Sequence, residues 1–408
     1  MKVSFLPFGC KVNQYDTQLL RETLAQRGFH LAGLEEAELV VVNTCCVTRK
    51  AEKESLSAAR RLLQRGKRVW LTGCLVRQEK ESLQKRLPEA AIYERDFILL
   101  FAPGLNGKIF LEKVKNISYF ANHVRAFVKV QEGCNNRCTY CLVPYVRGQS
   151  RSRQTSEILE EIKTLVANGY REIVLCGVDL GDYGRDNGSN FCQLAKQVLE
   201  IGIRVRFSSL EIFHISRRLL EVLKKSENFC PHFHLPLQSG SDRILRLMGR
   251  RYTTSDYLTA VHLTREYFPQ VTFTTDCLVG FPGEKEEDFH LTEQIVKKVG
   301  FLKIHVFPYS RRPGTPAAMF PEQLPQTLIR ERRRRLHNLA TGVATKEKEK
   351  FLGTEQTVLV EKITGETAFG HTPGYLPVCF PNQGHQVNEL VRVRLTGLSG
   401  DWLEGVLV

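Results

Sequence analysis

The segment Cys134-Asn135-Asn136-Arg137-Cys138-Thr139-Tyr140-Cys141 carries three thiols within eight residues. It comes directly after an apolar run over 126–131 that predicts a strand. Because α/β folds build their sites at the carboxyl ends of strands, this loop predicts a metal centre. A structural zinc or an electron-transfer cluster normally takes four protein ligands. Three cysteines therefore favour a [4Fe–4S] cluster with one open iron, and the alternative is a zinc ion completed by a distant His or Cys.

The strand before this loop is the first of six in the middle of the chain, most of them separated by helical segments. The predicted strands are 126–131, 172–178, 204–210, 232–235, 272–279 and 302–307. Strands that alternate with helices predict a parallel sheet with helices on its faces. A complete eight-stranded barrel typically takes about 250 residues. Six units therefore predict either an open sheet or a partial (β/α)6 barrel.

The N-terminal section repeats this alternation and predicts a parallel α/β domain. The predicted strands are Lys2–Phe8, Glu38–Val42 and Arg68–Thr72, and the predicted helices are Gln14–Arg27 and Ala51–Gln64. The stretch 88–120 is less regular and predicts no definite element.

One cysteine follows each of these three N-terminal strands, namely Cys10, Cys45 and Cys74. Since the carboxyl ends of parallel strands share one edge, we expect the three thiols to converge in a second three-ligand cluster. A single buried cysteine is more often a small apolar core residue than a metal ligand. Cys46 offers a neighbouring thiol in this motif, and we favour Cys45 as the ligand.

The C-terminal section alternates apolar and polar residues between glycines, for example over 357–361 and 390–395. This pattern predicts a small antiparallel β-barrel. Three sets of side chains are either RNA contacts or solvated surface: Arg147, Arg151 and Arg153 after the cysteine loop, the arginines between 330 and 335, and Arg392, Arg394, His371 and Tyr375 of the barrel.

Composition limits the class of protein. The 408 residues predict two to three domains, and the net charge of +14 favours a polyanionic partner, most simply nucleic acid. No apolar run approaches the ~20 residues of a membrane span. The longest, Phe97–Ala102, predicts a buried strand or helix turn. With no N-terminal signal-peptide pattern, we expect a cytoplasmic protein without membrane contact, whose cysteines stay reduced.

The cysteine loop, with an aromatic residue before its last cysteine, resembles the radical S-adenosylmethionine superfamily. The resemblance implies that Cys134, Cys138 and Cys141 bind a [4Fe–4S] cluster whose open iron binds S-adenosylmethionine. It further implies that Tyr140 lies near the adenine and that the backbone at Gly177 meets the amino group of the cofactor. The expected chemistry is reductive cleavage to methionine and a 5′-deoxyadenosyl radical.

Further motifs resemble the methylthiotransferase family within that superfamily. They are Gly9-Cys10-Lys11-Val12-Asn13-Gln14, Asn43-Thr44-Cys45, Thr72-Gly73-Cys74, the stretches 234–241 and 279–284, and 307–315. The resemblance implies three domains: 1–120 with an auxiliary [4Fe–4S] cluster held by Cys10, Cys45 and Cys74, a radical domain over 121–345, and an RNA-binding TRAM barrel over 346–408.

The first motif is most similar to family members that act on N-threonylcarbamoyladenosine. This implies methylthiolation of adenine carbon 2 in the tRNA anticodon stem-loop, with one S-adenosylmethionine as methyl donor and another as radical source. A flavodoxin- or ferredoxin-like electron donor and a sulfur donor are the implied partners. The alternatives are the same chemistry on isopentenyladenosine or on an aspartate of a ribosomal protein, and a non-catalytic, zinc-stabilised RNA-binding protein.

Overall fold

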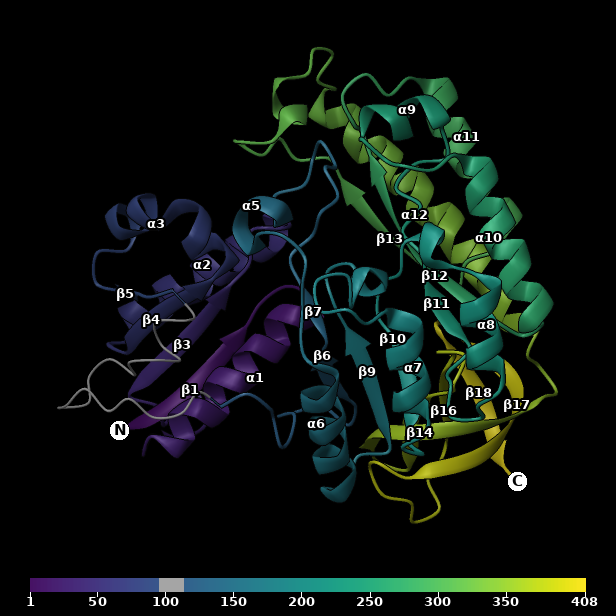
Figure 1. The fold of residues 1–408 in the computed structure, drawn as a ribbon, viewed down its shortest axis with the longest axis horizontal. Coiled ribbons are helices and arrows are strands. Elements are labelled where there is room, and N and C mark those ends of the chain that lie inside the picture. Colours follow the sequence, from purple (N-terminus) through teal and green to yellow (C-terminus); the bar gives the residue numbers. More distant parts are fainter. Residues whose placement is uncertain (95–113) are drawn as a thin grey trace.

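Figure 1 shows the computed structural model, which describes residues 1–94 and 114–408 in three successive parts. The element predicted at 97–102 lies outside the described residues. No helix among the described residues is long and apolar enough to cross a bilayer.

The N-terminal part is a parallel five-stranded sheet in the order β2-β1-β3-β4-β5. Its strands are β1 (Lys2–Pro7), β2 (His30–Leu31), β3 (Leu39–Thr44), β4 (Arg68–Gly73) and β5 (Ala91–Ile92), and its helices are α1 (Lys11–Gln26), α2 (Arg49–Gln64) and α3 (Cys74–Arg86). The predicted parallel α/β domain is confirmed. The strand order reverses between β1 and β3, and α/β proteins bind ligands in the crevice at the carboxyl ends of such strands.

The middle part contains the six predicted strands: β6 (Ala126–Lys129), β9 (Glu172–Cys176), β10 (Arg204–Phe207), β11 (His232–His234), β12 (Thr272–Val279) and β13 (Lys303–Pro308). Two parallel sheets, β10-β9-β6 and β11-β12-β13, are joined by bridges such as Ser209 to His234. The strands therefore follow one another around a partial barrel. The helices of this part are α5 (Val143–Arg147), α6 (Thr155–Ala167), α7 (Phe191–Leu199), α8 (Arg217–Lys224), α9 (Asp242–Leu247), α10 (Thr254–Tyr267), α11 (Glu286–Val299) and α12 (Gln326–Glu349).

The C-terminal part is a closed barrel in the order β14-β15-β16-β18-β17. Its strands are β14 (Glu355–Thr364), β15 (Thr367–His371), β16 (Pro377–Pro381), β17 (Leu390–Ser399) and β18 (Trp402–Leu407). The predicted small barrel is confirmed, with one departure: β16 and β18 pair in parallel, and the other pairs are antiparallel.

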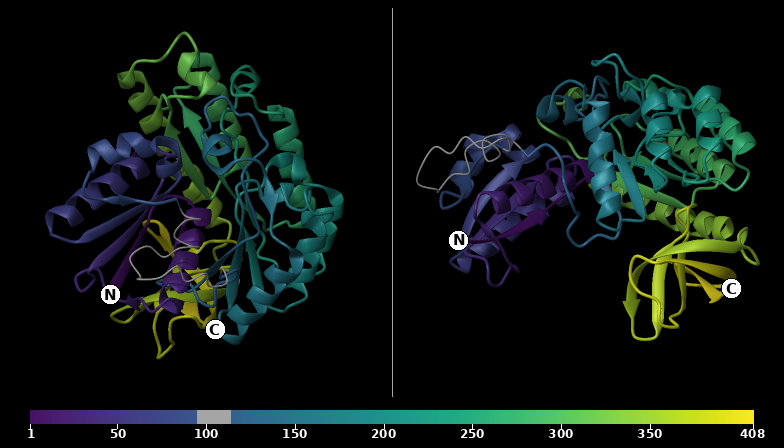
Figure 2. Two further views of the ribbon diagram at one scale, coloured as in Figure 1. Left: turned by 60° about the vertical axis from the view of Figure 1, so that its left-hand side comes forward. Right: turned by 60° about the horizontal axis from the view of Figure 1, so that its bottom comes forward.

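Two interfaces hold the three parts together. Helix α1 lies against the middle part, and the Lys129 ammonium is 2.5 Å from an Asp16 carboxylate oxygen (Figures 1 and 2). On the other side, the Arg206 guanidinium donates to the carbonyl oxygens of Thr372 and Pro373 of the C-terminal barrel. The N-terminal sheet thus adjoins β6, whereas the C-terminal barrel adjoins the amino-terminal ends of β10 to β12.

Candidate functional site

The cysteine loop runs from the short strand β7 (Gln131–Glu132) to α5. Each of its three thiols lies 3.4 Å from one N–H donor. The amide of Asn136 faces Cys134 Sγ, the amide of Val143 faces Cys141 Sγ, and the guanidinium of Arg250 faces Cys138 Sγ. Hydrogen bonds to sulfur stabilise a thiolate and tune an iron–sulfur cluster.

The three cysteines of the loop are half-buried. Burial raises the pKa of Cys134 and of Cys141 to about 12, although the neighbouring amides act in the opposite direction. Neighbouring thiols of this loop also raise the pKa of Cys134 and of Cys141. A bound metal centre would replace the protons and remove this cost.

Two glycines shape the loop. Gly133 has φ +76°, and a Cβ there would lie 1.9 Å from the Gln149 carbonyl oxygen. Gly249 has φ +71° and adjoins the carbonyl of Arg137. Its backbone turn presents Arg250, which forms a buried ion pair with Glu211 in addition to its contact with Cys138. Sequence reasoning missed Arg250, for which the glycine before it was the available signal.

The residues predicted to meet S-adenosylmethionine lie close by. Tyr140 belongs to the loop, and its ring packs edge-on against Phe281 at 6.4 Å. Gly177 directly follows β9, and a Cβ there would lie 2.9 Å from Gln131 Oε1. Gln131 in turn accepts from the amides of Val178 and Asp179 and donates to the Gly133 carbonyl. The β9 end and the cysteine loop are therefore linked by one side chain.

The three N-terminal cysteines do converge. Cys10 caps α1, Cys45 follows β3 and Cys74 begins α3. Burial raises the pKa of Cys45 to about 11, and Cys10 and Cys74 are among the groups that raise it further. Gly9, at φ +89°, allows the close approach, because a Cβ there would lie 2.5 Å from Cys45 Sγ.

Cys46 occupies a different environment from Cys45. Its thiol hydrogen-bonds Cys74, which raises the pKa of Cys46 and lowers that of Cys74, and its side chain belongs to an apolar cluster that includes Cys74 but not Cys45. We expect Cys45→Ser to lose the N-terminal iron and Cys46→Ser to keep most of it, as measured by iron per chain after anaerobic reconstitution. Equal losses would contradict this assignment.

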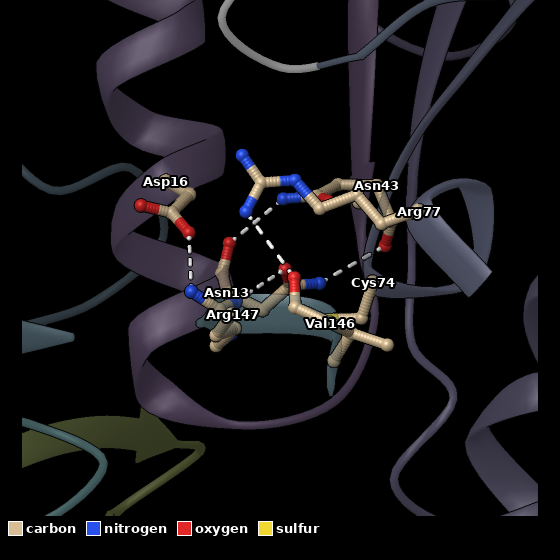
Figure 3. A pocket seen from close by; sticks show the side chains of 8 residues that line it. Asn13, Asp16, Asn43, Cys74, Arg77, Val146 and Arg147 are labelled. Carbon is tan, nitrogen blue, oxygen red and sulfur yellow. Dashed lines mark hydrogen bonds and ion pairs between the residues drawn. The ribbon is translucent and has the colours of Figure 1, made fainter. Parts of the chain in front are cut away.

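A buried arginine on the helix that follows the cysteine loop lies beside Cys74 of the N-terminal set (Figure 3). Arg147 ends α5, which begins two residues after Cys141, and its guanidinium donates to Asp16 at 3.0 Å and to Asn13 at 3.1 Å. Burial alone would lower the pKa of Arg147, but Asp16, Cys74 and Cys10 raise it above its ordinary value. A fixed positive charge therefore lies beside the N-terminal thiols.

This geometry corrects several expected RNA contacts. Arg147 is buried and Arg153 is half-buried, the latter in an ion pair with Glu161 at 2.8 Å, whereas Arg151 is exposed. On α12, Arg332 is buried against Glu284, and Arg330, Arg333 and Arg334 face solvent.

Two of the four expected contacts of the C-terminal barrel are engaged within this chain. Tyr375 stacks on His371 and packs against His232 and Arg206 of the middle part, so these two barrel side chains serve an interface between parts of this chain. Arg392 and Arg394 both pair with Glu355 on the barrel surface.

Comparisons with known proteins agree with this architecture. The model of the radical SAM superfamily matches residues 128–295, and that of the uncharacterized protein family UPF0004 matches residues 2–93. The chain is 40% identical to the threonylcarbamoyladenosine tRNA methylthiotransferase MtaB of Chlamydia pneumoniae, over 98% of this chain and 96% of that protein. It belongs to the radical S-adenosylmethionine methylthiotransferase family.

Two further similarities bear on this family and its fold. The chain is 36% identical to the tRNA-2-methylthio-N(6)-dimethylallyladenosine synthase of Desulfitobacterium hafniense, over 96% of this chain and 94% of that protein. The radical S-adenosylmethionine methyltransferase TsrM from Kitasatospora setae superposes with a TM-score of 0.59 at 14% identity, over 78% of this chain and 77% of that one, which shows a shared fold.

Family membership makes this chain an enzyme that uses two [4Fe–4S] clusters and S-adenosylmethionine. The structure fits these groups, since it gathers two sets of three thiols and supplies an N–H donor to each thiol of the loop. The alternative of a non-catalytic zinc protein is therefore wrong.

Proposed function

We propose that this enzyme adds a methylthio group to carbon 2 of N-threonylcarbamoyladenosine in the anticodon stem-loop of tRNA. The observation that carries the proposal is the presence of two sets of three thiols, with Arg147 on the helix that follows the cysteine loop lying beside Cys10 and Cys74 of the other set. Methylthiolation needs both a radical source and a sulfur carrier, and this arrangement supplies a site for each. The MtaB proteins of Chlamydia pneumoniae and of Thermotoga maritima, 40% and 35% identical to this chain, support the threonylcarbamoyl substrate.

Within this proposal, Cys134, Cys138 and Cys141 hold the cluster that binds S-adenosylmethionine, and Cys10, Cys45 and Cys74 hold the auxiliary cluster. When bound, these groups supply a carbon-centred radical and sulfur. Tyr140 and Gly177 border the cofactor, and Arg250 holds negative charge at Cys138. The buried Arg147 balances the charge of the thiolates at Cys10 and Cys74.

The remaining assignments follow from this chemistry. We propose the segments 1–120, 121–345 and 346–408 as the auxiliary-cluster, radical and RNA-binding TRAM domains; helix α12 crosses the last boundary and ends at Glu349. An electron donor of the flavodoxin or ferredoxin type and a sulfur donor are the required partners. A tRNA substrate and reduced thiols favour the cytoplasm.

The test offers reconstituted enzyme three stem-loop RNAs that differ only in the adenosine next to the anticodon: threonylcarbamoylated, dimethylallylated and unmodified. We expect a methylthio product, followed by mass spectrometry of the nucleosides, from the threonylcarbamoyl RNA and at least about 100-fold less from the others. Product from the dimethylallyl RNA alone would replace this proposal with its second candidate, which the 36% identity to the Desulfitobacterium hafniense enzyme supports.

A further inference from the structure

A cluster of polar side chains on three adjacent strands of the partial barrel has no role in the sites described above. His234 ends β11, Asp276 lies on β12, and His305 lies opposite Asp276 in the register of β13. Their ligand atoms all lie within 4.8 Å of one another, and His234 Nε2 is 3.4 Å from Asp276 Oδ1. His234 and Asp276 are half-buried and His305 is exposed, so a substrate group can reach them.

The side chain of Lys11 reaches the same interior. Lys11 is the first residue of α1, and α1 lies against β6 on the open side of the partial barrel. Burial has the largest effect on the pKa of Cys176, Asp276 and His305. The positive charge of Lys11 lowers the pKa of all three groups. These three residues belong to β9, β12 and β13, so the positive charge of Lys11 acts on three strands of the partial barrel.

The cluster suits an organic substrate better than a metal ion. Two histidines and a carboxylate are common metal ligands. However, the Lys11 ammonium next to them opposes a second cation, and one ring nitrogen of His234 already contacts the Thr274 hydroxyl at 2.9 Å. A positive charge beside a hydrogen-bonding carboxylate and two imidazoles instead matches a ligand that carries its own carboxylate together with N–H and O–H groups.

The two candidate adenosines differ in this respect. A threonylcarbamoyl group has ureido N–H groups, a hydroxyl and a carboxylate, whereas a dimethylallyl group is apolar. We propose that Lys11, His234, Asp276 and His305 form the subsite that receives the threonylcarbamoyl group, with the Lys11 ammonium pairing with its carboxylate. This inference rests on the proposed function and adds the residues that select the substrate.

The expected loss of affinity follows from leaving polar groups of the subsite without hydrogen-bond partners. A charged hydrogen bond removed from a binding site costs about 10- to 150-fold in affinity. A site that hydrogen-bonds its ligand rejects an analogue lacking those groups by up to about 10⁴-fold, because its own polar groups are left unpaired. The dimethylallyl group would leave the whole subsite without partners.

The experiment is a double-mutant cycle between Lys11 and the substrate carboxylate. Reconstituted parent, Lys11→Gln and Lys11→Arg enzymes bind two fluorescent stem-loop RNAs, one with the threonylcarbamoyl group and one with its neutral threoninamide analogue. We expect the amide to weaken binding to the parent about 30-fold and to weaken binding to Lys11→Gln less than about 3-fold. Lys11→Arg should keep most of the parent's discrimination.

Two controls separate this result from damage to the protein. Lys303→Gln removes another lysine that lowers the pKa of His305 and that lies at the amino-terminal end of β13. This variant should bind both RNAs as the parent does. Iron per chain reports whether Lys11→Gln, next to Cys10, still holds its clusters. If Lys11→Gln loses iron, the test is whether the parent enzyme binds the threonylcarbamoyl RNA more tightly than its threoninamide analogue.

The inference is overturned if the parent binds the acid and amide RNAs equally, or if Lys11→Gln loses as much on the amide as the parent. Stoichiometric metal that persists after all six cluster cysteines are replaced, and that Asp276→Asn removes, would also overturn it. A parent that methylthiolates only dimethylallyl RNA would instead reject the proposed function, which is a separate result from the binding cycle.

Discussion

Replacing Cys134, Cys138 and Cys141 together with alanine is expected to lower the iron content from about eight to about four per chain. The reason is that the two sets of thiols lie on separate elements, β7 to α5 on one side and the ends of β1, β3 and β4 on the other. Reductive cleavage of S-adenosylmethionine should fall to background in the same variant, because no open iron remains to bind it. Iron, acid-labile sulfide and 5′-deoxyadenosine are the measurements.

The reciprocal variant makes this prediction specific. Alanine at Cys10, Cys45 and Cys74 should also leave about four irons, but should retain cleavage of S-adenosylmethionine and lose methylthio transfer. Cys192→Ala is the matched control, since this half-buried cysteine lies on α7 and its thiol donates to the Arg218 carbonyl oxygen at 3.8 Å. About four irons in the parent and none in the first variant would contradict a second cluster.

Local patterns in the sequence predicted the strands and the order of the sites. Alternation of apolar runs with amphipathic segments identifies the six strands of the partial barrel, and the repeated cysteine after β1, β3 and β4 predicts that three distant thiols converge. Both inferences need only the rule that parallel strands end at a common edge. The short strands β2 and β5 were missed because two residues carry no periodicity.

Partners that are distant in sequence could not be predicted in the same way. Arg147 was expected either to bind RNA or to face solvent, but it pairs with Asp16, 131 residues earlier. Tyr375 was expected to contact RNA or solvent, yet it packs against Arg206. A charged or aromatic side chain has the same local pattern whether its partner is RNA, water or another strand, and only the tertiary fold decides between them.

Among residues whose partners are distant in sequence, Glu172 is the one whose replacement we expect to destabilise the folded protein most. Its carboxylate is fully buried at the start of β9, 2.8 Å from Arg206 Nε and 3.0 Å from Arg204, with Arg125 at 3.7 Å. Arg206 in turn holds the C-terminal barrel, and Arg125 reaches Glu361 of β14. One carboxylate therefore neutralises a set of guanidinium groups at the junction with the barrel.

We expect Glu172→Gln to destabilise this junction by about 3–5 kcal/mol, because it leaves buried positive charge without its partner. Trp402 lies in the C-terminal barrel and Trp70 in the N-terminal sheet, and they are the two tryptophans of the chain. Urea unfolding followed by the fluorescence of Trp402 in a Trp70→Phe background therefore reports on the junction. Glu200→Gln is the control, since its exposed pair with Lys196 should change stability by less than about 1 kcal/mol.

The pH dependence of the same variant gives an independent check. Burial alone would raise the pKa of Glu172, but Arg206, Arg204 and Arg125 lower it below the ordinary value for glutamate. A carboxylate with a lowered pKa in the folded state contributes stability that is fully present above its unfolded pKa, about 4.3, and is lost as the pH falls through the folded value. The difference between parent and Glu172→Gln should therefore be constant from about pH 6 to 8 and shrink as the pH falls below about 4. A difference that stays unchanged at lower pH would mean that the glutamine acts through its shape and not through the missing charge.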